Sequence, residues 1–374
     1  MNETDSHKNL LFETSPFGNV DAIVEHDGRA IYFYLNAHDP QGTRFPTKAC
    51  WVRNLVPGPL VINRKEMEQG IPPLLPRTHC RHPHSQPLPS PDTLDVVWFE
   101  EGNAAALCEN DQVLAVIPPW SGTEGFHGYA TDCVAESPIC WPMPAGASDP
   151  LLRRIDEARS FWNSFQSGDT DPFKKLQQEI LESYESRFGK LDSYFAIDGN
   201  SFPPRGLARY RKNGRLVFLT VAMSLCPQPN VELFVDQPGW YRRIEMGLQV
   251  PDSISETQIA TLQTRLSSIA GFPWRKMTWL GQGHSINFMT GETLGDQPAD
   301  FALAMTEAFI RDSSQDISQA GEPESAPPIT LPQFRNDPVN LIWLLPISEP
   351  VRDKLQSNTL LPEQVLLDTD FIRW

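Results

Sequence analysis

Short β-prone runs separated by polar turns dominate the beginning of the chain. Apolar and β-branched residues fill positions 20–24 and 30–35, and His26-Asp27-Gly28 lies between the two runs. Glycine tolerates the positive φ that a tight hairpin turn requires. This pattern predicts two paired antiparallel strands.

The same spacing of strands and turns continues over a longer stretch. Three further short β-prone runs lie at residues 96–99, 104–107 and 113–117, and polar turns separate them. A proline-dense excursion at 57–91 interrupts the series and predicts either an ordered irregular segment or a flexible loop. We therefore expect a β-rich N-terminal module over residues 9–147.

Helical periodicity begins after this module. Asp149 is suited to cap a helix and Pro150 fits its first turn, and the same start recurs at Asp171 and Pro172. The polar join at 166–170 is the expected domain boundary. We interpret residues 148–170 as a helical linker and residues 171–374 as a second domain.

The second domain mixes strands and helices without regular alternation. Ser255 and Gln258 predict a capping box that opens a helix. Strands are expected at 215–222, 231–235, 241–250 and 339–345, and helices at 255–270, 301–310 and after Ser348. The acidic, proline-containing stretch 312–330 predicts a mobile loop. The fold class expected is α+β, a mixed β-sheet with flanking helices preceded by the β-rich module.

Composition limits the function. No apolar run in the 374 residues is long enough to span a bilayer, and the N-terminus lacks the pattern of a signal peptide. We therefore expect a soluble, cytoplasmic protein with no membrane association. A net charge of −16 argues against nucleic acid as a partner. Six cysteines without a CxxC pair favour free thiols.

Acidic residues are unevenly distributed. Between Arg81 and Arg153 there is no lysine or arginine, whereas ten aspartates or glutamates occur, including Glu100 and Glu101. One interpretation is a solvated surface that maintains solubility. The other is a docking face for a basic partner, which complementary potential would steer.

Two N-terminal motifs contain residue types that are used in chemistry. His79, His82 and His84 flank Cys80 and could bind zinc or copper, but no second Cys/His pair has zinc spacing, so we expect no metal. Near Trp120 and Phe126, the residues Ser121, Glu124 and His127 could form a hydrolase site. The order is not Gly-x-Ser-x-Gly, which leaves a structural role as the alternative.

A third motif lies in the second domain. Residues 279–286 read Trp-Leu-Gly-Gln-Gly-His-Ser-Ile, and Trp240-Tyr241 precedes the expected strand at 241–250. The two glycines do not complete a nucleotide-binding loop, so no nucleotide cofactor is expected. Trp279 and His284 could anchor a ligand or a peptide, or could close a turn.

This third motif resembles the W-L-G-x-G-H-[ST]-I stretch of bacterial Suppressor of fused domain proteins. Ordered matches around it extend the resemblance over roughly residues 170–374: 199–204, 217–224, 239–250, 255–270, 272–273 and 344–348. The N-terminal part resembles an extra module that precedes this domain in some bacterial members. The resemblance implies an α/β sandwich-like domain without enzymatic activity and without catalytic residues to transfer.

The resemblance also implies a binding function. Animal members restrain a transcription factor by clamping a peptide strand, and bacterial members are often interpreted as immunity proteins against toxins. We expect a non-enzymatic, cofactor-free protein that binds a protein partner, such as a basic toxin. The residues expected to contact the partner are Trp279, His284, Trp240, Tyr241, Trp120, Phe126, Glu100 and Glu101. A hydrolase and a two-domain regulatory scaffold are the alternatives, and the oligomeric state is left open.

Overall fold

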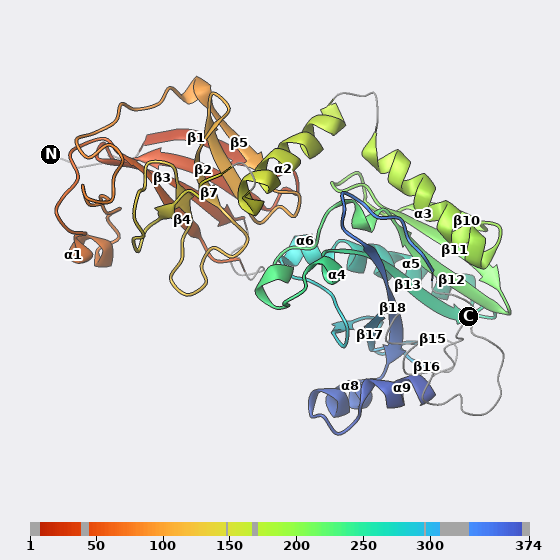
Figure 1. Ribbon diagram of the computed structural model, residues 1–374. Helices are drawn as coiled ribbons and strands as arrows, with labels where there is room; N and C mark the ends of the chain where they lie inside the picture. The colour runs from red at the N-terminus through yellow and green to blue at the C-terminus, as the bar shows by residue number, and fades with distance from the viewer. Residues whose placement is uncertain are drawn as a thin grey trace. The chain divides into compact units, whose positions relative to one another are not determined.

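The computed structural model describes residues 8–38, 45–146, 149–166, 171–294, 297–306 and 329–368. The chain divides into two compact units. Unit 1 contains residues 1–169 together with 232–234 and 274–277, and unit 2 contains the remainder. Both units combine strands and helices (Figure 1), so the expected α+β fold class is confirmed.

Unit 1 contains two β-sheets. One has the order β1-β2-β3-β4, and the other has the order β5-β6-β7-β8-β9 with β8 and β9 parallel. The strands are β1 Lys8–Thr14, β2 Val20–His26, β3 Ala30–Ala37, β4 Lys48–Asn54, β5 Leu94–Trp98, β6 Ala105–Glu109, β7 Gln112–Ile117, β8 Tyr129–Ala130 and β9 Trp141–Pro142. The helices are α1 Arg64–Glu68 and α2 Pro150–Gln166, with a 3₁₀ turn at Pro91–Thr93. The predicted hairpin is confirmed, since β2 pairs with β3 and Gly28 has φ +83°.

The second sheet of unit 1 is buried on both faces because its residues alternate between two cores. Val96, Trp98 and Leu107 belong to a core that they share with residues of the β1–β4 sheet. Their chain neighbours Val97 and Ala106 belong to a second core on the opposite face. Successive side chains of a strand point to opposite faces, which produces this division.

Helix α2 covers that second face. Its residues Leu151, Ile155 and Ala158 are buried in the same core as Val97. Asp149 accepts a hydrogen bond from the Leu151 N–H (Oδ1–N 2.8 Å) and so supplies the expected cap. The stretch expected to be a linker therefore contains a helix that is an integral part of unit 1.

Unit 2 is built on a seven-stranded sheet of order β10-β11-β12-β13-β18-β17-β14, in which only the β13–β18 pair is parallel. Its strands are β10 Ser193–Ala196, β11 Gly206–Lys212, β12 Arg215–Val221, β13 Arg243–Pro251, β14 Ser285–Asn287, β17 Phe301–Thr306 and β18 Val339–Ile347. A separate pair consists of β15 Thr293–Leu294 and β16 Gln297–Pro298.

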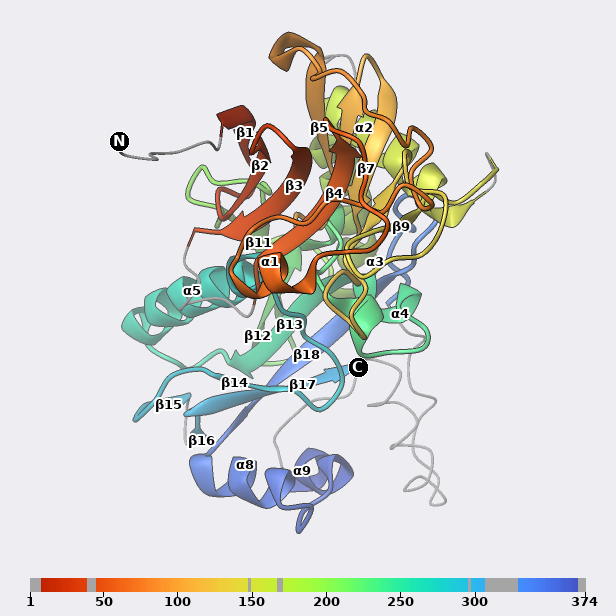
Figure 2. The ribbon, with the colours of Figure 1, turned by 90° about the vertical axis from the view of Figure 1, so that its left-hand side faces the viewer.

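Helices flank this sheet. They are α3 Pro172–Phe188, α4 Gly239–Arg242, α5 Glu256–Ala270, α8 Glu349–Gln356 and α9 Pro362–Asp368, with a 3₁₀ turn at Met223–Leu225. Helix α6 Phe272–Lys276 and the 3₁₀ turn Val231–Leu233 each contain residues of both units. Figure 2 shows α5 running beside β12 and β13. The Asp171 cap of α3 and the Ser255–Gln258 capping box of α5 are both confirmed.

Two predicted elements are wrong. Residues 301–306 form strand β17 rather than a helix, because this segment lies between β18 and β14 and pairs with both. Alanine-rich sequence favours a helix locally, but pairing in the sheet overrides that preference. The expected strand at 231–235 instead contains the 3₁₀ turn Val231–Leu233. The loop expected at 312–330 lies almost entirely outside the described residues.

A buried carboxylate joins two neighbouring strands of unit 2. Glu245 on β13 is 0% exposed and accepts hydrogen bonds from the hydroxyls of Thr220 and Ser224 and from the main-chain N–H groups of Met223 and Ser224. The Oε2–Oγ1 distance to Thr220 is 2.6 Å. Burial raises the pKa of Glu245, and these four donors oppose that effect.

We expect Glu245→Gln to lower the free energy of unfolding by about 2–4 kcal/mol. The amide nitrogen would face buried N–H donors and leave at least one unpaired, and each buried unpaired group costs about 1–3 kcal/mol. Urea unfolding followed by circular dichroism measures the effect. The exposed Glu292→Gln is the matched control and should change stability by less than about 0.5 kcal/mol. Equal stability of the two variants would contradict the role assigned to Glu245.

Candidate functional site: an apolar groove on unit 1

The proline-dense excursion of unit 1 forms one side of an apolar groove. The groove has a volume of about 600 Å³. Its apolar lining comes from two distant parts of the chain, namely Leu60, Val61, Ile62, Met67, Pro76 and Pro138. Leu60 and Val61 are 70% and 73% exposed, which is unusual for side chains of this size.

Polar groups of both charges lie among these apolar side chains. Arg64, Glu68, His79, Glu136 and Ser137 also line the groove. Apolar walls with a few polar groups are typical of sites that bind a ligand or a peptide, because the walls supply affinity and the polar groups fix orientation.

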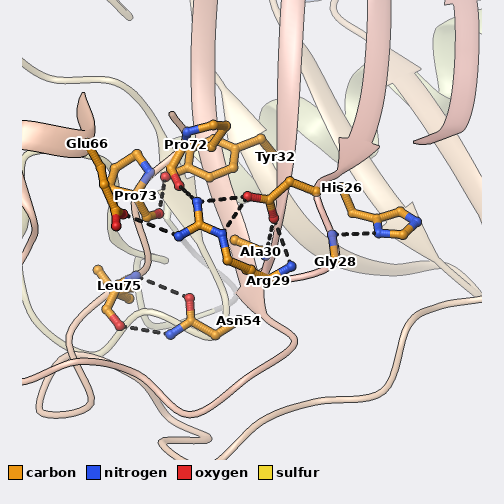
Figure 3. A network of polar contacts seen from close by, with 11 residues as sticks. His26, Gly28, Arg29, Ala30, Tyr32, Asn54, Glu66, Pro72, Pro73 and Leu75 are labelled. Atoms are coloured by element: carbon orange, nitrogen blue, oxygen red, sulfur yellow. Dashed lines mark hydrogen bonds and ion pairs between the residues drawn. The ribbon is translucent and has the colours of Figure 1, made fainter. Parts of the chain in front are cut away.

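The groove depends on polar contacts that fix the excursion to strand β3 (Figure 3). The Arg29 guanidinium pairs with Asp27 (Nη2–Oδ2 2.8 Å) and Glu66 (Nη1–Oε2 3.2 Å) and also donates to the Pro72 carbonyl (Nη2–O 3.1 Å). Glu66 belongs to the short helix α1, which contributes Arg64, Met67 and Glu68 to the groove. One arginine thus attaches both α1 and the chain after it to the sheet.

Two further side chains hold the excursion beyond α1. The Tyr32 hydroxyl donates to the Pro73 carbonyl (2.5 Å). The Asn54 amide pairs with both main-chain groups of Leu75: Nδ2 donates to the Leu75 carbonyl (2.8 Å) and Oδ1 accepts from the Leu75 N–H (3.1 Å). Figure 3 shows this two-bond pairing directly. It reproduces with a side chain the contacts that a neighbouring strand would make.

The motif in unit 2 forms an aromatic group. The Trp279 ring packs edge-on against Tyr241 (centroids 5.5 Å apart) and against His284 (4.5 Å). Three of the residues expected to contact a partner therefore lie together. Burial lowers the pKa of His284, which favours the neutral ring, and its Nδ1 accepts a hydrogen bond from the Gly281 N–H (3.2 Å). His284 thereby closes the turn around Gly281.

A buried glutamine positions this aromatic group. Gln228 is 2% exposed, and its Nε2 donates to the carbonyls of Tyr241 (2.7 Å) and Leu280 (3.0 Å), while its Oε1 accepts from the Leu280 N–H (2.9 Å). Gly281 must be glycine because an added Cβ would lie 2.3 Å from the Trp279 ring. Trp240, the fourth residue expected here, precedes Tyr241 in α4 and is 56% exposed.

The expected N-terminal contact residues do not form a comparable surface. Phe126 is 6% exposed, and its ring packs against Tyr129 and Trp141 (centroids 4.8 and 5.0 Å apart). Trp120 is half-buried against the core beneath α2. These rings serve the packing of unit 1.

The two expected acidic contacts are also internal. Glu100 and Glu101 are 7% and 2% exposed. Glu101 forms a close ion pair with Arg154 of α2, which also pairs with Glu232 (Nη1–Oε1 2.9 Å). Their position within the base-free stretch of sequence therefore does not place them on the surface.

A buried lysine lies in the same polar region. Lys48 Nζ donates to the carbonyls of Asn103 and Pro119, both at 3.1 Å. Burial lowers the pKa of Lys48 to about 7, and the charges of Glu101 and Glu232 partly oppose this shift. Lys48 is thus held by main-chain carbonyls inside the unit.

The residues considered for catalysis or metal binding have other partners. The Ser121 hydroxyl donates to the main-chain carbonyl of His127 rather than to its imidazole ring. His79 contacts the Thr78 hydroxyl (Nδ1–Oγ1 3.0 Å), and His82 lies 3.8 Å from Asp132 (Nε2–Oδ1). Across the described residues, no three histidines, cysteines or carboxylates converge closely enough to hold a metal ion.

Comparison with known proteins gives no relative: no family model, no curated protein and no solved structure matches this chain. Within the described ranges, no helix is both long and apolar enough to cross a membrane.

The groove was not identified from the sequence. Its walls come from residues 60–79 and 136–138, which only the fold brings together. The available signal was the proline-dense excursion itself, in which exposed aliphatic residues stand beside prolines.

We expect Asn54→Ala to destabilise unit 1 by about 2–4 kcal/mol. The change leaves the buried N–H and carbonyl of Leu75 without their partner, at about 1–3 kcal/mol for each group. Urea unfolding provides the measurement, with the exposed Asn9→Ala as the control. An unchanged unfolding midpoint for Asn54→Ala would show that the excursion is held without this pairing.

Lys48 should make stability depend on pH. Its folded pKa of about 7 lies below the value near 10.4 in an unfolded chain, so between these values the unfolded state binds more protons. The free energy of unfolding therefore rises with pH from about 7 to about 10, by up to about 4 kcal/mol from this group.

Lys48→Met should remove that rise, so the difference in the free energy of unfolding between the wild type and this variant should change with pH between about 7 and about 10. Denaturant titrations at several pH values compare it with the wild type and with Lys8→Met, a change at an exposed lysine. Parallel curves for wild type and Lys48→Met would contradict the assignment.

Proposed function

We propose that this protein acts by binding another protein, and that the groove of unit 1 holds an apolar segment of the partner. The observation that carries the proposal is the exposure of Leu60 and Val61 on a groove of about 600 Å³. Burying such a side chain contributes about 1.5–3 kcal/mol, so exposing two together favours a partner that covers them.

Charge supports a basic partner. The chain has a net charge of −16, and the groove is lined by two glutamates, Glu68 and Glu136, and by one arginine, Arg64. A negative surface speeds the approach of a positive protein and disfavours acidic ones. The apolar lining then determines how slowly the complex dissociates.

A binding role also agrees with the arrangement of the residues considered for catalysis. The Ser121 hydroxyl donates to the His127 main-chain carbonyl, whereas a serine nucleophile donates to a neighbouring base such as a histidine ring. The specific form that we propose is a cytoplasmic, immunity-type inhibitor of a basic toxin, in line with the resemblance to bacterial Suppressor of fused domain proteins.

The test begins with capture of the partner from the native strain on the immobilised full chain. The dissociation constant of the purified partner is then measured by calorimetry. Val61→Asp should weaken binding about tenfold or more, because the partner would then have to bury a charge in place of a valine side chain. A loss of about 1.4 kcal/mol corresponds to a factor of ten in the dissociation constant. The association rate should fall as salt increases.

Leu88→Asp is the matched control. Leu88 is exposed in the same unit but does not line the groove, and its substitution adds the same charge. It should leave the dissociation constant within about twofold. Equal effects of the two substitutions would exclude the groove as the binding site, and the absence of any captured protein would argue against the function.

A further inference from the structure

Four cysteines gather in unit 1 beside the groove. Cys50, Cys80, Cys133 and Cys140 are all buried with free thiols. Cys133 is their shared neighbour, because it lies opposite Cys80 in an isolated β-bridge and its sulfur lies 3.8 Å from the Cys140 carbonyl oxygen. It is also close enough to Cys50 to help raise the pKa of that thiol. Cys133 is therefore the thiol from which a disulfide could form.

Cys140 is better placed than Cys80 to be its partner. The Cys133 sulfur lies 3.8 Å from the Cys140 carbonyl oxygen, and its thiol donates to the Ala135 carbonyl within the same loop (3.0 Å). Cys80 lies opposite Cys133 in an isolated β-bridge, but its thiol donates to the Leu75 carbonyl and accepts from Asn54 Nδ2, both at 3.4 Å. The Cys80 sulfur is thus already engaged by the contacts that hold the excursion.

The short segment between Cys133 and Cys140 is already folded back on itself. Ser137 pairs with Cys140 in an isolated bridge, and the Ser137 N–H donates to the Cys140 carbonyl (3.0 Å). The Ser137 hydroxyl accepts from the N–H groups of Ile139 and Cys140, both at 3.3 Å. Because the ends of this loop are already close, joining them costs little chain entropy.

The environment also distinguishes the two sulfurs chemically. The hydrogen bond from Cys140 lowers the pKa of the Cys133 thiol, whereas burial raises the pKa of Cys140. The thiolate is the nucleophile in thiol oxidation, so Cys133 is the sulfur that reacts first.

We propose that Cys133 and Cys140 form a reversible disulfide when the protein meets a hydroperoxide. The Cys133 thiolate attacks one oxygen of hydrogen peroxide, the O–O bond breaks, and hydroxide leaves and takes up a proton to become water, which gives a sulfenic acid. The Cys140 sulfur then attacks the Cys133 sulfur. The S–S bond forms, the S–O bond breaks, and the oxygen leaves as a second water with the thiol proton of Cys140.

This site goes beyond the proposed binding function but lies in the same wall. Glu136, Ser137 and Pro138 line the groove and are enclosed between the two cysteines. The disulfide would join the two ends of this wall. Val134, 49% exposed at the start of the segment, lies at its solvent side. Because Cys133 and Cys140 are 2% and 0% exposed, the reaction requires local opening of this short loop to admit a water-sized oxidant.

The experiment uses the full reduced chain, hydrogen peroxide as the oxidant, and trapping of the remaining thiols with N-ethylmaleimide in denaturant. The number of alkylated cysteines should fall from six to four and return to six after dithiothreitol. Combined cleavage by trypsin and Glu-C separates Cys133, in residues 125–136, from Cys140, in residues 137–153. These two peptides should be recovered joined under non-reducing conditions.

The matched variants are Cys140→Ser, which should abolish the joined peptide, and Cys80→Ser, which should leave it intact. The peptide map of the wild-type protein identifies the disulfide even if one of these variants fails to fold. Recovery of residues 78–81 joined to the Cys133 peptide would assign the bond to Cys80 and overturn the pairing. Six alkylated cysteines after peroxide treatment would overturn the site altogether. Neither result depends on whether a protein partner is found.

Discussion

Unit 1 depends on side chains that satisfy the main chain of a segment unable to form a strand. Nine of the 35 residues at 57–91 are prolines, and proline has no N–H to donate to a neighbouring strand. Side chains supply the missing pairing: Arg29 and Tyr32 donate to the carbonyls of Pro72 and Pro73. Asn54 pairs with both the carbonyl and the N–H of Leu75. The groove exists because this segment is fixed to the sheet without becoming part of it.

The same arrangement explains why apolar side chains remain exposed. A strand would direct alternate residues into a core, but the chain around Leu60 and Val61 is irregular and turns them outward. The facing wall, around Ser137, is also irregular and is fixed by hydrogen bonds between Ser137 and Cys140. The proposed binding site and the proposed disulfide therefore share one short loop whose shape is determined by a few polar contacts.

Local signals in the sequence are sufficient to predict much of the fold but not the residues that line the groove. The hairpin at Gly28 and the capping box at Ser255 are determined by neighbouring residues, so both were predictable. Strand β17 was mistaken for a helix because its conformation depends on pairing with β18, which is distant in sequence. The contact of Trp279 with Tyr241 and the groove likewise join residues far apart in the chain. Counting acidic residues along the sequence predicts that Glu101 contacts a partner, because the count does not reveal the ion pair between Glu101 and Arg154.

Burial of charged residues does not weaken the electrostatic part of the binding model. Among the described residues, the buried residues that count toward the formal charge are three glutamates and four basic residues: Glu100, Glu101, Glu245, Lys48, Arg53, Arg205 and Arg243. Their charges nearly cancel, so the rest of the chain carries essentially the whole formal charge of −16. Long-range attraction of a basic protein therefore needs no contribution from Glu100 or Glu101. In the proposed complex, electrostatic attraction would govern the rate of encounter and the groove would govern the rate of dissociation, so surface charge and Val61 would alter the two rates independently.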